Sequence, residues 1–140
     1  MFLRNCFRVL KLLYILRMSE CSDNMILDQF DKLLRDGLTK ILQIDLDDKW
    51  RQVNLPIGFG GLGIRSAKTL APCAFFASAA STRTLESSIL RQSFRDMKDT
   101  TVDSTLPIWS SLSQIKEPHN MHQHIQKAWD SIVASAQVEL

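Results

Sequence analysis

The sequence contains few of the residues that end or bend regular structure. Five glycines and four prolines are spread over 140 residues, which argues against a sandwich of many short strands joined by turns. Cysteine is also scarce: Cys6, Cys21 and Cys73 are odd in number, far apart and without a Cys-x-x-Cys pair. A secreted disulfide framework is therefore disfavoured, and a reducing compartment, nuclear or cytoplasmic, is expected.

No apolar run approaches the roughly 20 residues that a membrane-spanning helix needs. The most apolar stretch, residues 2–18, is interrupted by bases at positions 4, 8, 11 and 17. Its uncharged centre, residues 12–16, is shorter than the core of about 7–15 residues in a secretory signal. We therefore expect no membrane partner. Because the stretch is basic, acid-free and amphipathic, a mitochondrial presequence remains a minor alternative to a core helix with one solvated basic edge.

Charge is distributed unevenly along a chain whose composition, 45% hydrophobic and 23% charged, is that of an ordinary globular domain. Residues 1–18 carry four bases and no acid, and residues 19–48 carry eight acids against three bases. Residues 49–98 carry eight bases against two acids, and residues 99–140 two bases against five acids. A polyanion would therefore meet two regional basic segments rather than a uniformly positive surface.

Helical periodicity dominates the chain. It is clearest over residues 26–42, where apolar residues recur on one face after an N-cap at Ser22 or Asp23. Three acids in this segment precede a base by four residues, a spacing that stabilises a helix: Asp28 and Lys32, Asp31 and Arg35, Asp36 and Lys40. Gly37 inside the segment indicates a close helix neighbour.

The rest of the chain predicts an all-α fold, an irregular bundle of five to six helices with a glycine-rich, non-helical turn at 53–65. We expect the alanine-rich run 67–81 to be buried, with Pro72 in the first turn of its helical part, and another helix over 84–97. An Asp- and Thr-rich stretch predicts an exposed polar linker at 99–106. The organisation is then a helical region 1–98, the linker, and a C-terminal helical segment 107–140 that packs on the first.

Three motifs suggest chemistry, but their contexts favour structural roles. Gly58 to Gly63 matches the dinucleotide-binding pattern G-x-G-x-x-G without the strand before it or the acid after it, so a structural turn built on Gly58, Gly60, Gly61 and Gly63 is expected. The acids at 45, 47 and 48 are expected to cap a short helix that leads to Trp50, rather than to hold Mg²⁺. The histidines at 119, 122 and 124 lack the spacing of metal ligands on one helix face. We therefore predict no catalytic residues, no metal site and no cofactor in this chain.

Several segments carry a resemblance to a known family. Leu55–Ala67 (LPIGFGGLGIRSA), followed by Leu70–Ala80 (LAPCAFFASAA), resembles a stretch that follows the palm and thumb in reverse transcriptases of non-LTR retrotransposons. Ile125–Ser131 (IQKAWDS) is similar to a later box of the same proteins. Residues 4–6 and 11–17 resemble the thumb-region helix of these proteins. Phe30, Asp31 and Trp50 lie between that helix and the glycine-rich segment, in the order in which the family has them.

The resemblance implies an RNA-directed DNA polymerase as the parent activity, with Mg²⁺ as the cofactor of the parent enzyme. The palm aspartates of the family precede the region that is matched, so the resemblance implies a thumb and post-thumb region without its catalytic centre. Its implied partners are an RNA/DNA duplex and the palm region of the parent polymerase.

A thumb of this kind holds the template–primer duplex through the phosphate backbone, which requires Lys and Arg side chains. The candidates are Arg4, Arg8, Lys11, Arg65, Lys68, Arg91 and Arg95. The alternative is a helical protein-interaction or orphan module without a nucleic-acid role, in which these bases keep the chain soluble. Convergence of the basic side chains on one exposed face would favour the first hypothesis, and their scatter the second.

Overall fold

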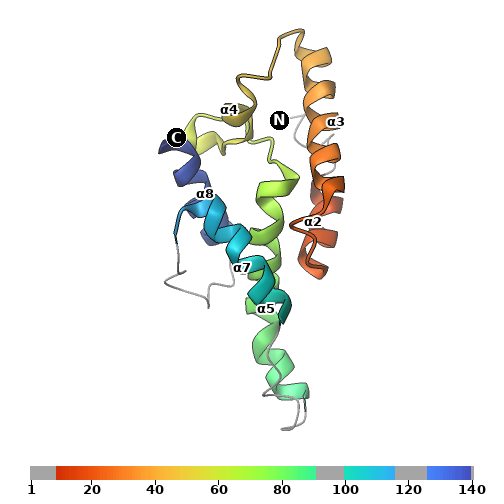
Figure 1. Ribbon diagram of the computed structural model, residues 1–140, viewed down its shortest axis with the longest axis vertical. Helices are drawn as coiled ribbons and strands as arrows, with labels where there is room; N and C mark the ends of the chain where they lie inside the picture. The colour runs from red at the N-terminus through yellow and green to blue at the C-terminus, as the bar shows by residue number, and fades with distance from the viewer. Residues whose placement is uncertain (1–8, 91–99, 116–125, 140) are drawn as a thin grey trace.

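The computed structural model describes residues 9–90, 100–115 and 126–139, and their regular structure is helical throughout (Figure 1). Six α-helices and one short 3-10 helix account for it, which confirms the predicted all-α bundle. The elements are α2 (Val9–Met18), α3 (Met25–Leu42), α4 (Trp50–Asn54), η1 (Ile57–Phe59), α5 (Ala67–Ile89), α7 (Thr100–Ser113) and α8 (Gln126–Glu139).

The long helix α5 is the central element. In Figure 1, α2 and α3 lie on one side of α5, and α7 and α8 lie on the other. The sequence explains why α5 can be surrounded: Ala67, Ala71, Ala74 and Ala77 are all buried, and their small side chains allow neighbouring helices to approach closely. The predicted burial of the alanine-rich segment is confirmed.

The interior consists of three apolar clusters. Leu16 and Leu27 pack on the alanine side of α5 between α2 and α3, and Leu34 and Leu38 of α3 pack on the segment that runs from α4 to the glycine-rich turn. The third cluster is aromatic and joins α5 to α7 and α8. Its residues are Cys73, Phe76, Ala77, Val102, Trp109, Trp129 and Val133.

The glycine-rich segment is a turn, as predicted, but the predicted non-helical bounds of 53–65 were too wide, since Val53 and Asn54 belong to α4 and Ile57–Phe59 forms η1. Gly60 and Gly63 have φ angles of 78° and 71°, a region that side chains other than glycine rarely adopt. Gly61 is required for a different reason, since a Cβ there would lie 2.0 Å from the Leu55 carbonyl oxygen. Gly58 has neither constraint.

Replacing Gly61 with alanine should therefore destabilise the fold. The methyl group would displace the Leu55 backbone. Adding a group to a filled space typically lowers the free energy of unfolding by about 1–3 kcal/mol, and we expect a value near the upper end of this range. Urea unfolding followed by circular dichroism measures it. Gly58→Ala is the matched control, because a Cβ at Gly58 meets no atom within 4 Å. Equal effects of the two substitutions would show that close packing at Gly61 is unimportant.

Several predicted boundaries were wrong. The N-cap of α3 is Asn24, whose side chain accepts a hydrogen bond from the Ile26 N–H, instead of Ser22 or Asp23. Pro72 lies inside α5, because the helix begins at Ala67 and is capped there by Ser66. Helix α5 continues to Ile89, so the break predicted before Thr84 is absent. Residues 91–97 of the helix predicted over 84–97 lie outside the described residues.

The predicted polar linker at 99–106 was also wrong. Residues from Thr100 on form the first turns of α7, which continues through Pro107. Val102 and Thr105 are buried against the core, and the Thr105 hydroxyl donates to the Thr101 carbonyl one turn earlier. Contacts with the core, which the polar composition of the segment does not reveal, make it helical.

Candidate nucleic-acid interface

The seven predicted phosphate-binding residues are described unequally by the structure. Arg4, Arg8, Arg91 and Arg95 lie outside the described residues, and Lys11 lies in α2 but its side chain is not described. Arg65 and Lys68 are therefore the two candidates whose surroundings can be examined.

Arg65 extends from the end of the glycine-rich turn into the protein. One terminal nitrogen, Nη1, donates to the Asn54 carbonyl oxygen at 2.8 Å, and the other, Nη2, donates to Oδ1 of Asp130 on α8. The two side chains are only 13% and 17% exposed. Arg65 thus joins the turn to α8, and a phosphate could reach its guanidinium only by displacing Asp130.

Lys68 lies at the surface in the first turn of α5. Its ammonium group donates to both carboxylate oxygens of Asp28, at 2.8 and 3.0 Å, and both side chains are about half exposed. An exposed pair of this kind contributes about 0–1 kcal/mol, so a phosphate can compete for Lys68. The adjacent carboxylate nevertheless lowers the local positive potential.

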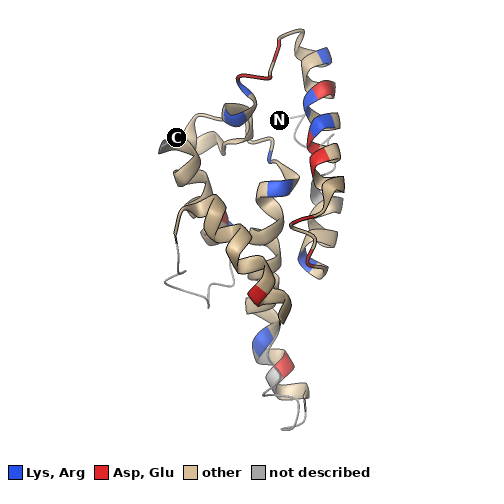
Figure 2. Cartoon of the chain, viewed as in Figure 1, with Lys and Arg blue, Asp and Glu red and all other residues tan. Residues whose placement is uncertain are grey.

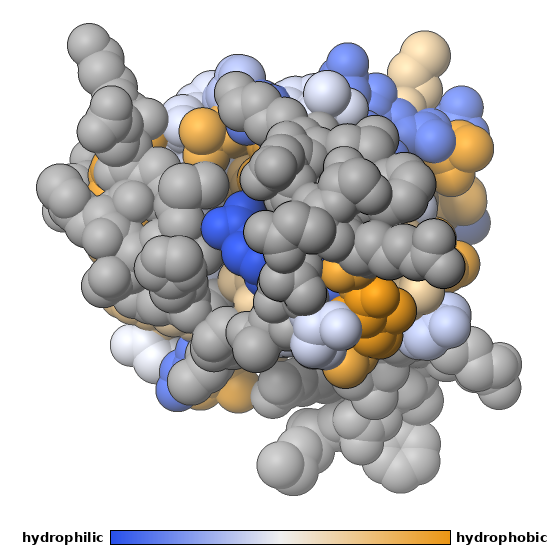
Figure 3. Space-filling view, turned by 90° about the horizontal axis from the view of Figure 1, so that it is seen from below, coloured by the Kyte–Doolittle hydropathy of each residue, from blue (hydrophilic) through white to orange (hydrophobic). Residues whose placement is uncertain are grey.

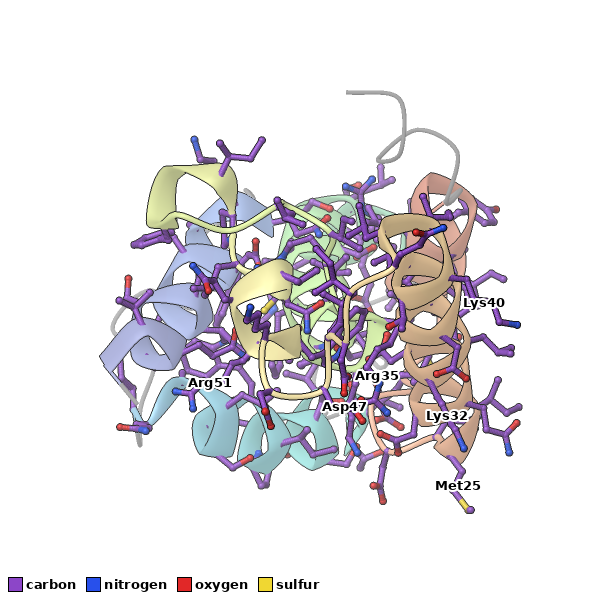
Figure 4. All side chains as sticks on the ribbon, turned by 90° about the horizontal axis from the view of Figure 1, so that it is seen from above. Met25, Lys32, Arg35, Lys40, Asp47 and Arg51 are labelled. Atoms are coloured by element: carbon purple, nitrogen blue, oxygen red, sulfur yellow. The ribbon has the colours of Figure 1, made fainter. Side chains whose placement is uncertain are left out.

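Asp31 has a structural role that the sequence pattern did not reveal. Its carboxylate accepts hydrogen bonds from the Ser66 hydroxyl and from the Ala67 N–H at 2.7 Å, and it therefore caps the N-terminus of α5 from the neighbouring helix α3. The predicted pairing of Asp31 with Arg35 was wrong. Arg35 instead lies 3.4 Å from Asp47, across the space between α3 and α4 that Figure 4 shows from above.

Residues that carry the family resemblance contact one another in this fold. Arg65 of the glycine segment binds Asp130 of the QKAWDS segment, and Asp31 caps the helix that begins with Ser66 and Ala67. Trp129 stacks on Phe76 of the alanine-rich segment, with ring centroids 5.1 Å apart. These matched segments therefore contact one another although the contacting residues are 35 to 65 positions apart in the sequence.

One side of α2 faces away from the core. Tyr14, Ile15 and Met18 are 68%, 55% and 66% exposed, whereas Leu16 is fully buried. In the sequence, Lys11, Arg8 and Arg4 precede Ile15 by four, seven and eleven residues, which is the spacing of one helix face.

The other described bases are scattered. Figure 2 shows Lys and Arg along α3, in α4, at the start of α5 and again near its far end. In Figure 4, Lys32 and Lys40 point outward from α3, whereas Arg51 lies across the molecule and donates to the Gln137 carbonyl oxygen at 3.0 Å. The described bases outside α2 therefore form no continuous basic face.

The acids that suggested a metal site participate in local structure. Oδ1 of Asp45 accepts a hydrogen bond from the Asp47 N–H, and Asp47 in turn pairs with Arg35. The prediction that these acids cap the short helix at Trp50 was wrong, since its N-cap is Lys49 without a side-chain bond. Within the described ranges, no three His, Cys, Asp or Glu side chains are grouped so as to hold a metal ion. The histidines at 119, 122 and 124 lie outside those ranges.

The two described cysteines are poor nucleophiles. Burial raises the pKa of the Cys73 thiol to about 12, and the nearby Asp130 carboxylate adds to this effect. Burial also raises the pKa of Cys21. Both side chains are therefore protonated at neutral pH, and a reactive thiolate at either position is disfavoured.

Comparisons with known proteins identify no relative: no family model, no curated protein and no solved structure matches the chain. Among the described helices, none combines the length and apolar character needed to cross a bilayer.

Proposed function

We propose that this chain is the helical region that follows the polymerase centre in a reverse transcriptase of the non-LTR retrotransposon kind, and that it binds the backbone of an RNA/DNA template–primer duplex. In this role it has no catalytic residues of its own, and the Mg²⁺-dependent chemistry belongs to the palm of the parent enzyme. The family assignment rests on the sequence resemblance, and the contacts among the matched segments are what one structural region of a parent protein requires.

The observation that carries the binding role is the exposure of Tyr14, Ile15 and Met18 on α2. In the sequence, Arg4, Arg8 and Lys11 precede Ile15 at the spacing of one helix face. Three bases without an acid, next to an exposed tyrosine, suit contacts with phosphates and sugars that are independent of base sequence. Arg65 is left out of this proposed interface because Asp130 and Asn54 already occupy its donors.

A titration of a fluorescent RNA/DNA hybrid at several salt concentrations tests the binding role. If the three N-terminal bases and one further base each neutralise a phosphate, the slope of log K against log salt should be about −3 to −4. The variant with Arg4, Arg8 and Lys11 all replaced by alanine should bind more weakly, with a slope that is less steep by about 2 to 3.

The matched control replaces Lys40, Lys49 and Arg83 by alanine. These three bases are exposed and lie in separate parts of the chain. Because both variants lose three bases, they change the net charge equally. The control should retain most of the slope. Equal losses in the two variants, or wild-type binding that is indifferent to salt, would contradict a specific role for the N-terminal bases.

The second candidate is a helical protein-interaction module without a nucleic-acid role. The scatter of the described bases outside α2 favours it. The same titration separates the two candidates, because this module would not bind the hybrid even at low salt.

A further inference from the structure

One side of α2 combines an exposed aromatic ring with aliphatic side chains and an arginine. Successive residues of an α-helix are about 100° apart, so Tyr14 and Met18 lie opposite the fully buried Leu16, with Ile15 and Arg17 to either side. We call Tyr14, Ile15, Arg17 and Met18 the α2 face; all four are exposed. Figure 3 shows apolar and strongly polar residues next to one another at the right edge of the view, the side on which α2 and α3 lie in Figure 1.

The charge of the α2 face is positive, and no described acid neutralises it. Arg17 donates through Nε and Nη2 to the side-chain oxygen of Gln126, at 3.3 and 2.8 Å. Because Gln126 is uncharged, Arg17 keeps its full positive charge, whereas Arg65 and Lys68 are paired with carboxylates. Helix α2 itself contains no acid. A polyanion is therefore the partner whose charge complements this face.

The aromatic and apolar side chains indicate which form of polyanion fits. A duplex keeps its base faces stacked inside, so it would offer Tyr14 and Met18 little beyond phosphates and sugars. An unpaired strand exposes its base faces, and it binds where aromatic rings lie beside cationic side chains. In the sequence, Lys11 precedes Tyr14 by three residues and Arg17 follows it by three, so both positions adjoin Tyr14 on the helix surface. The α2 face thus matches an unpaired strand better than a duplex.

We propose that the α2 face binds unpaired nucleotides of an RNA or DNA strand, with Tyr14 stacked on one base and Arg17 bound to a neighbouring phosphate. The face then holds the template where it continues unpaired beyond the template–primer duplex, a role that rests on the proposed function. Gln126 positions the Arg17 guanidinium for this contact. Because every base has a face on which a ring can stack, binding should be independent of sequence.

Fluorescence titrations with two probes test the α2 face: a blunt RNA/DNA hybrid and the same hybrid with a single-stranded RNA extension. The wild-type chain should bind the extended hybrid more tightly. Tyr14→Ala should weaken binding of the extended hybrid about fivefold or more and leave binding of the blunt hybrid unchanged. Tyr14→Phe keeps the ring and should bind both probes as the wild type does. Because Tyr14 is exposed, circular dichroism of both variants should show an intact fold.

Two matched controls complete the test. Phe59→Ala removes another exposed aromatic ring, in the glycine-rich turn, and should leave both affinities unchanged. Arg17→Gln should reduce the salt slope for the extended hybrid by about 0.7, the value for one phosphate of a single strand. Lys40→Gln, at an exposed position of α3, should not reduce it. Equal wild-type affinities for the two probes, or equal losses in Tyr14→Ala and Phe59→Ala, would overturn the proposal.

A third probe, the single-stranded RNA alone, separates this proposal from the duplex-binding role. If the blunt hybrid is bound and the extension adds nothing, only the role of the α2 face fails. If the single strand is bound through Tyr14 and the blunt hybrid is not bound, duplex binding fails and the α2 face stands. Binding of none of the three probes at low salt contradicts both.

Discussion

Trp109→Ala should destabilise the protein by about 4 kcal/mol, within the range of about 3–5 kcal/mol for removal of a buried tryptophan or phenylalanine. Trp109 is fully buried between α5 and α8. Its ring lies edge-on to Trp129 with centroids 5.3 Å apart, and edge-on to Phe76 at 6.4 Å. Truncation therefore leaves a large cavity where three helices meet, and urea unfolding at 25 °C measures its cost.

Two further substitutions separate ring packing from other effects at this site. Trp109→Phe keeps an aromatic ring next to Phe76 and Trp129, and it removes a buried indole N–H whose neighbour is the weakly accepting Cys73 thiol. It should therefore cost much less than Trp109→Ala. Phe59→Ala, at a partly exposed position in the turn, should cost less than about 1.5 kcal/mol, because full burial of an apolar side chain contributes about 1.5–3 kcal/mol and Phe59 is not fully buried. If Trp109→Ala and Phe59→Ala were equally costly, the aromatic cluster would not be the principal core.

Removing either partner of the Arg65–Asp130 pair should cost about 3–5 kcal/mol, because the remaining charge is then buried without a partner. The pair itself contributes much less. Burial raises the pKa of Asp130, and the nearby Arg65 opposes this rise only in part. Placing the carboxylate here therefore costs more in lost hydration than the attraction of Arg65 returns.

A double-mutant cycle tests this view of the pair. Arg65→Met combined with Asp130→Leu leaves no unpaired charge, so the double variant should lose less stability than the sum of the two single variants, Arg65→Met and Asp130→Leu. In the double variant the Asn54 carbonyl oxygen still loses its hydrogen-bond donor, so some loss of stability should remain. Additive single effects would contradict the assignment of Arg65 and Asp130 as an ion pair.

The raised pKa of Asp130 also predicts a pH dependence. A carboxyl whose pKa is higher in the folded than in the unfolded state binds its proton more tightly when folded, so this group makes stability fall as pH rises from about 4 through its folded-state pKa. Asp130→Asn removes this contribution. The difference in unfolding free energy between wild type and Asp130→Asn should therefore change across that interval and be constant above it. A flat difference over the whole range would argue against the shift.

The elements predicted most accurately were those whose local and tertiary requirements agree. Residues 26–42 combine a regular apolar face with acids four residues before bases, and α3 covers almost the same range. The glycine-rich turn was also recognisable, since φ angles above zero at Gly60 and Gly63 follow from residue type. The failures lie elsewhere. Thr100–Thr105 reads locally as a linker, and it is helical because Val102 and Thr105 face a core made by distant residues.

The candidate interface shows the same division. Periodicity alone predicted that Arg4, Arg8 and Lys11 share one helix face, and the structure shows that Tyr14, Ile15 and Met18 of α2 are exposed. Sequence could not distinguish Arg65 from these bases. Its role depends on Asp130, which is 65 residues away and reaches it only when α8 packs beside the turn.

The sequence by itself determined the helical class, the position of the turn and the helical phase of each apolar stripe, because these depend on residues within a few positions of one another. The tertiary structure alone decided which charges are internal, where α5 and α7 begin, and which side of α2 is left uncovered. Those outcomes depend on long-range contacts, such as Asp31 with Ser66 and Phe76 with Trp129, whose partners no local pattern specifies.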